Sequence, residues 1–175
     1  MSLQLTHVPL VLASKSAIRA KVLQDAGLHV EIVPSHIDED ILKAEIADPE
    51  RLAEALAVEK AKTVSAQHPS SLIIGSDQIM VCDGRQFDKP ANMREARNNL
   101  KFLAGKQHVL LSGIALIQNN VCLWSQTVTA KLRVKQMTDA YLDAYLAAAG
   151  ETILSSVGCY RLEDIGIQLF EEIEG

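Results

Sequence analysis

The hydroxyls of Ser14 and Ser16 and the guanidinium of Arg19 lie within one short segment, residues 14–19. Ser16 is a suitable N-cap for a helix that begins at Ala17, and the first turn of a helix presents free backbone N–H groups. Together with the Arg19 guanidinium, these groups could bind an anion such as a phosphate. An ordinary serine cap beside a solvated arginine is the alternative, and the spacing alone does not separate the two.

Lys60 falls inside the apolar sector of a helix predicted over residues 50–66. On a helical wheel Lys60 lies between Leu56 and Val64, whereas Lys62 falls on the opposite, charged face. A buried ammonium needs an anionic partner or a route to water. Lys60 could therefore bind a substrate anion, snorkel at a helix end, or pair with a structural carboxylate. If it has no partner, Lys60→Met should leave the fold as stable or more stable.

Asp77 follows the apolar run of residues 72–75. The run predicts a central strand with Asp77 facing solvent at its carboxyl end, where the ligand sites of α/β sheets gather. A carboxylate there could bind Mg²⁺ and activate a water molecule beside a phosphate chain. The alternative is a turn aspartate that bonds to its own backbone.

Lys89 precedes Pro90, and a residue before proline favours an extended backbone. That backbone could project the Lys89 ammonium across a cleft. A solvated loop lysine is the alternative.

The elements that must position these residues alternate between strand and helix. Gly27 is suited to end the helix that begins at Ala17, and strands are predicted over residues 8–13 and 29–34. A buried strand, or a pair of short strands, is predicted over residues 72–74 and 79–82. The alternation predicts an α/β fold with a mixed sheet.

The second half of the chain continues this pattern. Asn92 and Glu95 form a capping-box-like start to a helix that Gly105 ends, and Thr138 caps a helix that ends at Gly150. Asn119-Asn120 predicts a hairpin turn between two strands. The predicted strands of this half cover residues 109–118 and 121–134, with the last ones over 152–157 and 165–173.

The composition indicates one globular unit. The chain has 175 residues, of which 48% are hydrophobic and 22% charged. This apolar content argues against disorder, and the longest apolar stretch is too short to cross a bilayer. Residues 1–6 do not resemble a secretory signal, so we expect a cytoplasmic protein without a membrane partner.

The charge and the cysteines narrow the partners. The net charge is −5 and aromatic residues make up 4%, with no basic run, so a nucleic-acid polymer is not expected as a partner. Cys82, Cys122 and Cys159 are widely spaced and form no metal-ligand cluster with the histidines. We expect reduced thiols.

Five segments in order resemble the motif series of the Maf family of nucleotide pyrophosphatases. They are residues 12–19, 59–61, 75–78, 89–90 and 158–166. The resemblance runs from about Leu10 to Gly175, and five motifs in register are far more specific than a lone loop. Because family members usually continue into a Gly-Leu-Pro segment and a final helix, we expect one Maf-like domain over residues 1–175 without them.

The resemblance implies a two-lobed mixed-sheet fold similar to inosine-triphosphate pyrophosphatases, with a central nucleotide cleft. It implies hydrolysis of a nucleoside triphosphate to the monophosphate and pyrophosphate with a divalent cation, Mg²⁺ or Mn²⁺. Asp77 would be the proton acceptor, and Asp77 and Glu39 would bind the metal. Asp38 and Glu39 belong to an acidic family stretch, for which a solvated acidic loop is the alternative. The substrate phosphates would be bound by Ser14, Ser16, Arg19, Lys60 and Lys89.

Three positions resemble the subgroup that acts on 7-methyl-GTP rather than on dTTP or UTP. Ile18 replaces an arginine, Gln78 a threonine and Glu163 a glutamine of the dTTP/UTP subgroup. A carboxylate suits the donor groups of guanine and the positive charge that 7-methylation adds. The alternatives are neutral drift at these positions, or a Glu163 that forms a surface salt bridge.

Other functions stay open beside this one. Asp88 stands where the family usually has glycine, and Lys15 and Ala17 also depart from the first motif. A dTTP/UTP pyrophosphatase, a nucleotide-binding regulator with weak or no turnover, and a structural interaction protein are the alternatives. The sequence also leaves a homodimer open.

Overall fold

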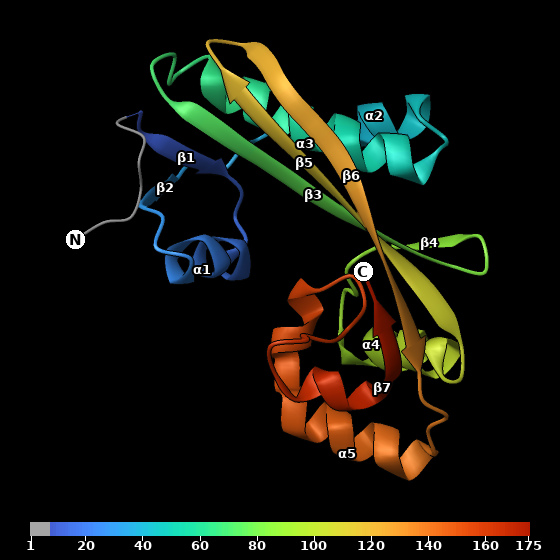
Figure 1. Cartoon of the computed structure of the whole chain (residues 1–175). Helices are drawn as coiled ribbons and strands as arrows, with labels where there is room; N and C mark the ends of the chain where they lie inside the picture. The colour runs from blue at the N-terminus through green and yellow to red at the C-terminus, as the bar shows by residue number, and fades with distance from the viewer. Residues whose placement is uncertain (1–7) are drawn as a thin grey trace. The chain divides into compact units, whose positions relative to one another are not determined.

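The computed structural model describes residues 8–175 and has a mixed α/β fold (Figure 1). Hydrogen bonds link the strands in the order β2-β1-β3-β5-β6-β7, and β4 pairs with β3. The strands are β1 (Leu10–Ala13), β2 (Val30–Ile32), β3 (Leu72–Cys82), β4 (Arg85–Phe87), β5 (Gln107–Gln118), β6 (Val121–Val134) and β7 (Phe170–Glu174). The helices are α1 (Ala17–Asp25), α2 (Glu39–Glu45), α3 (Pro49–Ser65), α4 (Met93–Leu103) and α5 (Asp139–Ala149), with 3₁₀ turns η1 (Gly150–Ser155) and η2 (Ile165–Leu169).

The chain divides into two compact units. Unit 1 comprises the described residues up to Gln78 together with Ser112–Val128, and unit 2 comprises Ile79–Leu111 and Thr129–Gly175. Strands β3, β5 and β6 therefore contribute residues to both units.

Unit 1 is built on parallel pairing. Strand β1 pairs with β2 on one side and with β3 on the other, and its last residue, Ala13, lies opposite Gly75. All four residues of β1 are buried, as expected for a central parallel strand. Helix α1 follows directly, and the Ser16 hydroxyl accepts a hydrogen bond from the Arg19 N–H as its N-cap.

Helix α3 packs on the sheet of unit 1 at two glycines. A Cβ placed on Gly75 would lie 2.0 Å from the Ala57 carbonyl oxygen, and one on Gly113 would lie 2.0 Å from that of Ala53. The small residues of the helix, among them Ala61, complete this close contact. The helix backbone therefore touches the strands directly, which fixes where its side chains point.

Unit 2 has its own apolar core between α4, α5 and the ends of β3, β5 and β6. Strand β7 pairs antiparallel with β6 over residues 131–134. At the core, His108 Nε2 lies 2.7 Å from the Tyr160 hydroxyl, and the Tyr160 ring meets Phe170 edge-on at a centroid distance of 4.7 Å.

Most of the predicted helix ends and the hairpin are confirmed. Asn92 and Thr138 cap α4 and α5 as predicted, and Asn119 and Asn120 both have positive φ between β5 and β6. A two-residue hairpin turn of type I′ requires positive φ at both of its central residues. No helix among residues 8–175 is long and apolar enough to span a membrane.

For residues 72–82 the single-strand alternative is confirmed, and Gly75 lies within this continuous strand where it admits α3. The strands predicted near the end of the chain are wrong. Residues 152–157 lie in a 3₁₀ turn and the bend after it rather than in a strand, and only the end of 165–173 is extended. Helix α2 and strand β4 were not predicted from the sequence.

Candidate active site

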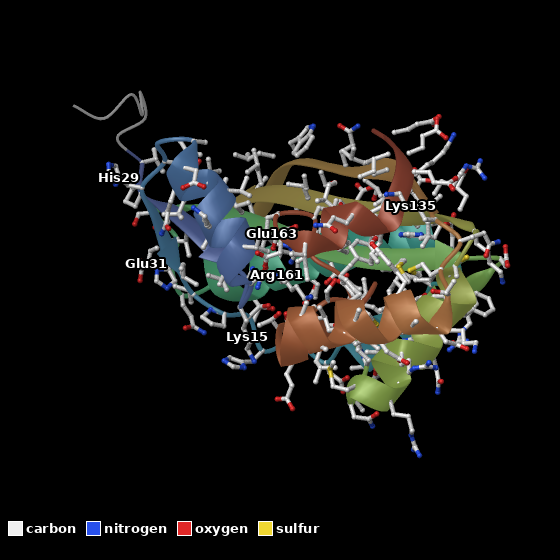
Figure 2. All side chains as sticks on the ribbon, turned by 90° about the horizontal axis from the view of Figure 1, so that it is seen from below. Lys15, His29, Glu31, Lys135, Arg161 and Glu163 are labelled. Carbon is white, nitrogen blue, oxygen red and sulfur yellow. The ribbon has the colours of Figure 1, made fainter. Side chains whose placement is uncertain are left out.

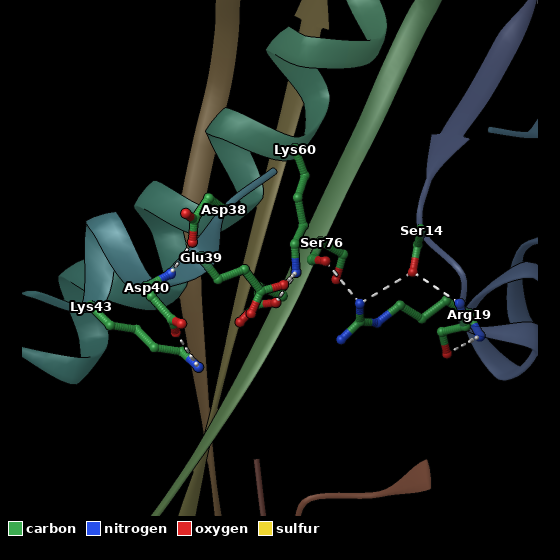
Figure 3. Close-up of polar contacts among 10 residues, drawn as sticks. Ser14, Arg19, Asp38, Glu39, Asp40, Lys43, Lys60 and Ser76 are labelled. Carbon is green, nitrogen blue, oxygen red and sulfur yellow. Dashed lines mark hydrogen bonds and ion pairs between the residues drawn. The ribbon is translucent and has the colours of Figure 1, made fainter. Parts of the chain in front are cut away.

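A buried lysine and two carboxylates meet in unit 1. The Lys60 Nζ atom lies 2.5 Å from Asp77 Oδ1 and 2.7 Å from Glu39 Oε1. Figure 3 shows Lys60 reaching from α3 towards Glu39 at the start of α2. The side chains of Lys60 and Asp77 are each 13% exposed, whereas that of Glu39 is 39% exposed. The inward direction predicted for Lys60 is confirmed, and its anionic partners are these two carboxylates.

The position of Asp77 corrects the prediction of a solvent-facing residue at a strand end. Asp77 lies in the middle of β3 and is buried. The pairing of β1 with β3 ends at Gly75, so Asp77 lies two residues beyond the carboxyl end of the neighbouring strand. Because side chains alternate along a strand, Asp77 shares the face of Gly75, which is the face that α3 covers.

Arg19 and Ser14 form a second polar group in the same unit. Arg19 Nη1 donates to the Ser76 carbonyl oxygen at 2.8 Å and to Ser14 Oγ at 3.4 Å. Ser14 Oγ also accepts from the Ser16 N–H at 3.1 Å, and Figure 3 shows these contacts beside the start of α1. The hydroxyls and the guanidinium therefore do gather at this helix start, tied to β3 through Ser76.

Burial and charge act against each other at Arg19. Burial lowers the pKa of the Arg19 guanidinium from its ordinary value, and the carboxylates of Asp77 and Glu39 oppose that shift. The Arg19 guanidinium nevertheless stays protonated, because arginine is not deprotonated in proteins. Unit 1 thus holds two buried or half-buried cations, Arg19 and Lys60, under the influence of the same two carboxylates.

The acidic stretch at residues 38–39 is a helix start rather than a loop. The Asp38 carboxylate caps α2 by accepting from the Asp40 N–H at 3.1 Å, and Asp38 is exposed. Glu39 is the first residue of α2 and turns to Lys60. Asp38 therefore has a structural task as the helix cap.

The two carboxylates on Lys60 suit a hard divalent cation. Mg²⁺ is commonly held by one or two carboxylates together with substrate phosphates, at oxygen ligands. Asp77 and Glu39 supply such oxygens, and Lys60 Nζ now holds them together. Among residues 8–175, no group of three or more His, Cys, Asp or Glu could hold a metal ion without further ligands. The residues fit a metal that the substrate helps to bind.

Two of the three predicted specificity positions belong to unit 1. Gln78 Nε2 donates to Ser112 Oγ at 3.1 Å, and Ile18 is half-buried in α1. Ser112 was not predicted as a partner of Gln78, because the contact joins residues far apart in the chain.

Lys89 and Glu163 belong to unit 2. Lys89 is exposed after β4, beside the exposed Asp88. Glu163 Oε1 accepts from Arg161 Nε at 2.9 Å, and Figure 2 shows the two side chains together. Arg161 also lies 3.4 Å from Asp164. A surface salt bridge was one of the alternatives for Glu163, and the positive charge of Arg161 two residues earlier was the signal for its partner.

Comparison with known proteins identifies relatives of this chain. The family model described as Maf-like protein matches residues 9–175. A nucleoside triphosphate pyrophosphatase of Granulibacter bethesdensis is 42% identical over 95% of this chain and 86% of its own length. A 7-methyl-GTP pyrophosphatase of Rhizobium etli is 42% identical over 95% of this chain and 85% of its own.

Among solved structures, a nucleoside-triphosphatase / dITP/XTP pyrophosphatase from Mycobacterium abscessus matches 74% of this chain and 76% of its own at 17% identity, with a TM-score of 0.41. The family match covers nearly the whole chain, including every motif on which the resemblance rested. The chain belongs to the Maf family.

Proposed function

We propose that this chain is a nucleoside triphosphate pyrophosphatase that prefers 7-methyl-GTP and releases pyrophosphate and the nucleoside monophosphate. The coarser part rests on family membership: curated relatives are named nucleoside triphosphate pyrophosphatases, which are hydrolases acting on acid anhydrides. The observation that carries the catalytic assignment is the contact of the largely shielded Lys60 and Asp77 with each other and of Lys60 with the more exposed Glu39.

Asp77 is the proposed proton acceptor. A carboxylate that is fixed by its strand and largely shielded from solvent can take a proton from an attacking water molecule. Lys60 Nζ pairs with Asp77 Oδ1 at 2.5 Å and brings a positive charge to the same point. When a phosphate chain enters, that charge can stabilise the negative charge that develops on the leaving pyrophosphate.

The remaining cations and hydroxyls are proposed to bind the phosphate chain. Ser14, Ser16 and Arg19 stand at the start of α1, where free N–H groups and the helix dipole favour an anion. Lys89 joins this set from the resemblance alone. Positioning of the triphosphate by several groups lowers the entropic cost of reaction.

A divalent cation, Mg²⁺ or Mn²⁺, is proposed as the cofactor, with Asp77 and Glu39 as its protein ligands. Such an ion offsets the charge of the phosphate oxygens when it is bound. Glu39 is the more exposed of the two carboxylates and sits at the first turn of a short helix, so it can leave Lys60 with little rearrangement.

The preference for 7-methyl-GTP rests on three positions and one relative. Ile18, Gln78 and Glu163 match the 7-methyl-GTP subgroup in the resemblance, and the Rhizobium etli relative carries that substrate in its name. Guanine presents donor groups on its Watson–Crick edge, and 7-methylation adds positive charge. Both favour a carboxylate such as Glu163 over an amide.

The test is a panel of 7-methyl-GTP, GTP, dTTP and UTP with Mg²⁺, scored by pyrophosphate release. We expect the highest kcat/KM for 7-methyl-GTP, with GTP between it and the pyrimidine nucleotides. Glu163→Gln should narrow the difference in kcat/KM between 7-methyl-GTP and the pyrimidine nucleotides. Asp164→Asn, which changes the other carboxylate partner of Arg161, should leave that difference unchanged. A pyrimidine nucleotide as the best substrate contradicts the substrate assignment, and nucleotide binding without pyrophosphate release contradicts the activity.

A further inference from the structure

The first half of β6 forms an edge of the sheet in unit 1. Hydrogen bonds join β6 to β5 on one side, whereas β7 pairs on the other side only with residues 131–134. Within residues 8–175, no strand pairs with residues 121–128 along that second side. An unpaired edge presents a row of backbone N–H and C=O groups that another strand can bind.

This edge is unusually apolar. Val121 and Leu123 are each 57% exposed, Val128 is 46% exposed and Trp124 is 43% exposed. Natural edge strands are normally protected by charged residues or proline, and residues 121–128 contain neither.

The edge is also held in place by α3. Ser125 Oγ lies 2.5 Å from Glu54 Oε1, and Thr127 Oγ1 donates to the Glu50 carbonyl oxygen at 2.9 Å. These bonds fix alternate side chains of the strand against the helix. The edge is therefore an ordered template that needs little rearrangement to accept another strand.

The lack of charged residues at this edge suits a second copy of this chain as that strand. The chain carries a net charge of −5, so two copies repel each other in general. Residues 107–130 contain no Asp, Glu, Lys or Arg, so two β6 edges meet without like charges opposite each other. Antiparallel pairing of a strand with its own copy around a two-fold axis lets each copy donate and accept the same bonds, which closes the assembly at two chains.

We propose that two copies of this chain form a dimer by antiparallel pairing of their β6 edges over residues 121–128. The pairing joins the sheets of the two copies and covers Leu123 and Trp124. It requires no nucleotide and stands apart from the proposed pyrophosphatase activity.

The chain contains its own reporters for this dimer. Trp124 is the only tryptophan, and Cys122 is exposed, whereas Cys82 and Cys159 are buried. We expect sedimentation of a nucleotide-free dilution series to show a dimer at high concentration and a monomer at low concentration. The Trp124 emission should shift to the blue and the reactivity of Cys122 towards a thiol reagent should fall in step with dimer formation.

Leu123→Lys tests the surface, and Val22→Lys, at a 61% exposed position in α1 of the same unit, is the matched control. We expect Leu123→Lys to weaken association by about tenfold or more, because dimer formation would desolvate its ammonium, and Val22→Lys to leave association unchanged. Val128→Lys tests the same edge if Leu123→Lys does not fold. A monomer at every concentration, a dimer that survives both edge variants, or a dimer in which Cys122 stays fully reactive would overturn the proposal.

Discussion

The two units use charged side chains in opposite ways. In unit 1, the ion pair of Lys60 with Asp77 is largely shielded from water, at 13% exposure of each side chain. In unit 2, the pair of Arg161 with Glu163 lies at the surface, at 34% and 36% exposure, and the buried polar contacts include the uncharged His108 with Tyr160. A shielded ion pair is costly to desolvate, whereas an exposed one contributes at most about 1 kcal/mol. The contrast supports the proposed catalytic role of the shielded charges of unit 1.

Lys60→Met should produce the largest effect short of removing Asp77. We expect pyrophosphate release to fall by about a hundredfold or more, because a preorganised positive charge is lost. The free energy of unfolding should also fall, by about 1–3 kcal/mol, because Asp77 and Glu39 then face each other without their shared cation. This reverses the stability change expected for an unpaired lysine. Activity assays and urea denaturation at neutral pH measure both.

Lys62→Met is the control for that variant. Lys62 lies on the exposed face of the same helix. Its replacement should change the stability by no more than about 0.5 kcal/mol and leave turnover intact. Equal losses of turnover and stability in Lys60→Met and Lys62→Met would show that the shielded and the exposed lysine of α3 contribute in the same way. That result would contradict the special role of the shielded charge.

Gly75→Ala should destabilise unit 1 by about 3 kcal/mol, because the new Cβ lies 2.0 Å from the Ala57 carbonyl oxygen. Gly113→Ala makes the same contact with Ala53 one turn earlier in α3, so its cost should be similar. Only the first substitution displaces the turn that carries Lys60. We therefore expect kcat/KM to fall more in Gly75→Ala than in Gly113→Ala, and equal kinetics in two folded variants would contradict this.

His108 should make the stability of unit 2 sensitive to acid. Burial lowers the pKa of His108 from 6.5 to about 4. The folded state therefore binds fewer protons than the unfolded state between these values, so stability falls as the pH drops through that window. From pH 7 to pH 5 the loss due to His108 should be about 2 kcal/mol.

His108→Gln is the matching variant, because glutamine can still hydrogen-bond to the Tyr160 hydroxyl but does not titrate. Urea denaturation at pH 7 and pH 5 should show a smaller decrease for His108→Gln than for the unchanged chain. The same decrease in both proteins would assign the acid sensitivity to other groups.

Arg161→Gln should have the smallest effect. The pairs of Arg161 with Glu163 and Asp164 are partly exposed, so their loss should cost less than about 1 kcal/mol in the free energy of unfolding. Thermal denaturation measures this. A loss of several kcal/mol would mean that the surface pairs of unit 2 are as important to the fold as the buried pair of unit 1.

The sequence predicted those features that local chemistry determines. Ser16, Asn92 and Thr138 cap helices because a side-chain oxygen can reach an N–H group two or three residues ahead. The inward direction of Lys60 followed from the helical period, because Lys60 shares one face of the helix with apolar residues that must pack inward.

Features that depend on distant residues were missed. The sequence left open whether residues 72–82 form one strand or two, because the close contact of α3 with the strand at Gly75 is not visible in the sequence. The start of α2 at Glu39 was also missed. The helix is short, and its contact with the site is made by Glu39 with Lys60, which is distant in the chain. The partners of a buried charge follow from packing and not from spacing along the chain.

The kinetic comparison of Asp77→Asn with the unchanged chain tests the central claim most directly. Asparagine has nearly the shape of aspartate, and Lys60 keeps Glu39 as a partner, so the free energy of unfolding should change by no more than about 1 kcal/mol. Pyrophosphate release from 7-methyl-GTP with Mg²⁺ should fall by about 10²–10⁴-fold, with nucleotide binding retained. Turnover that survives in the folded Asp77→Asn variant would contradict the assignment of Asp77 as the proton acceptor.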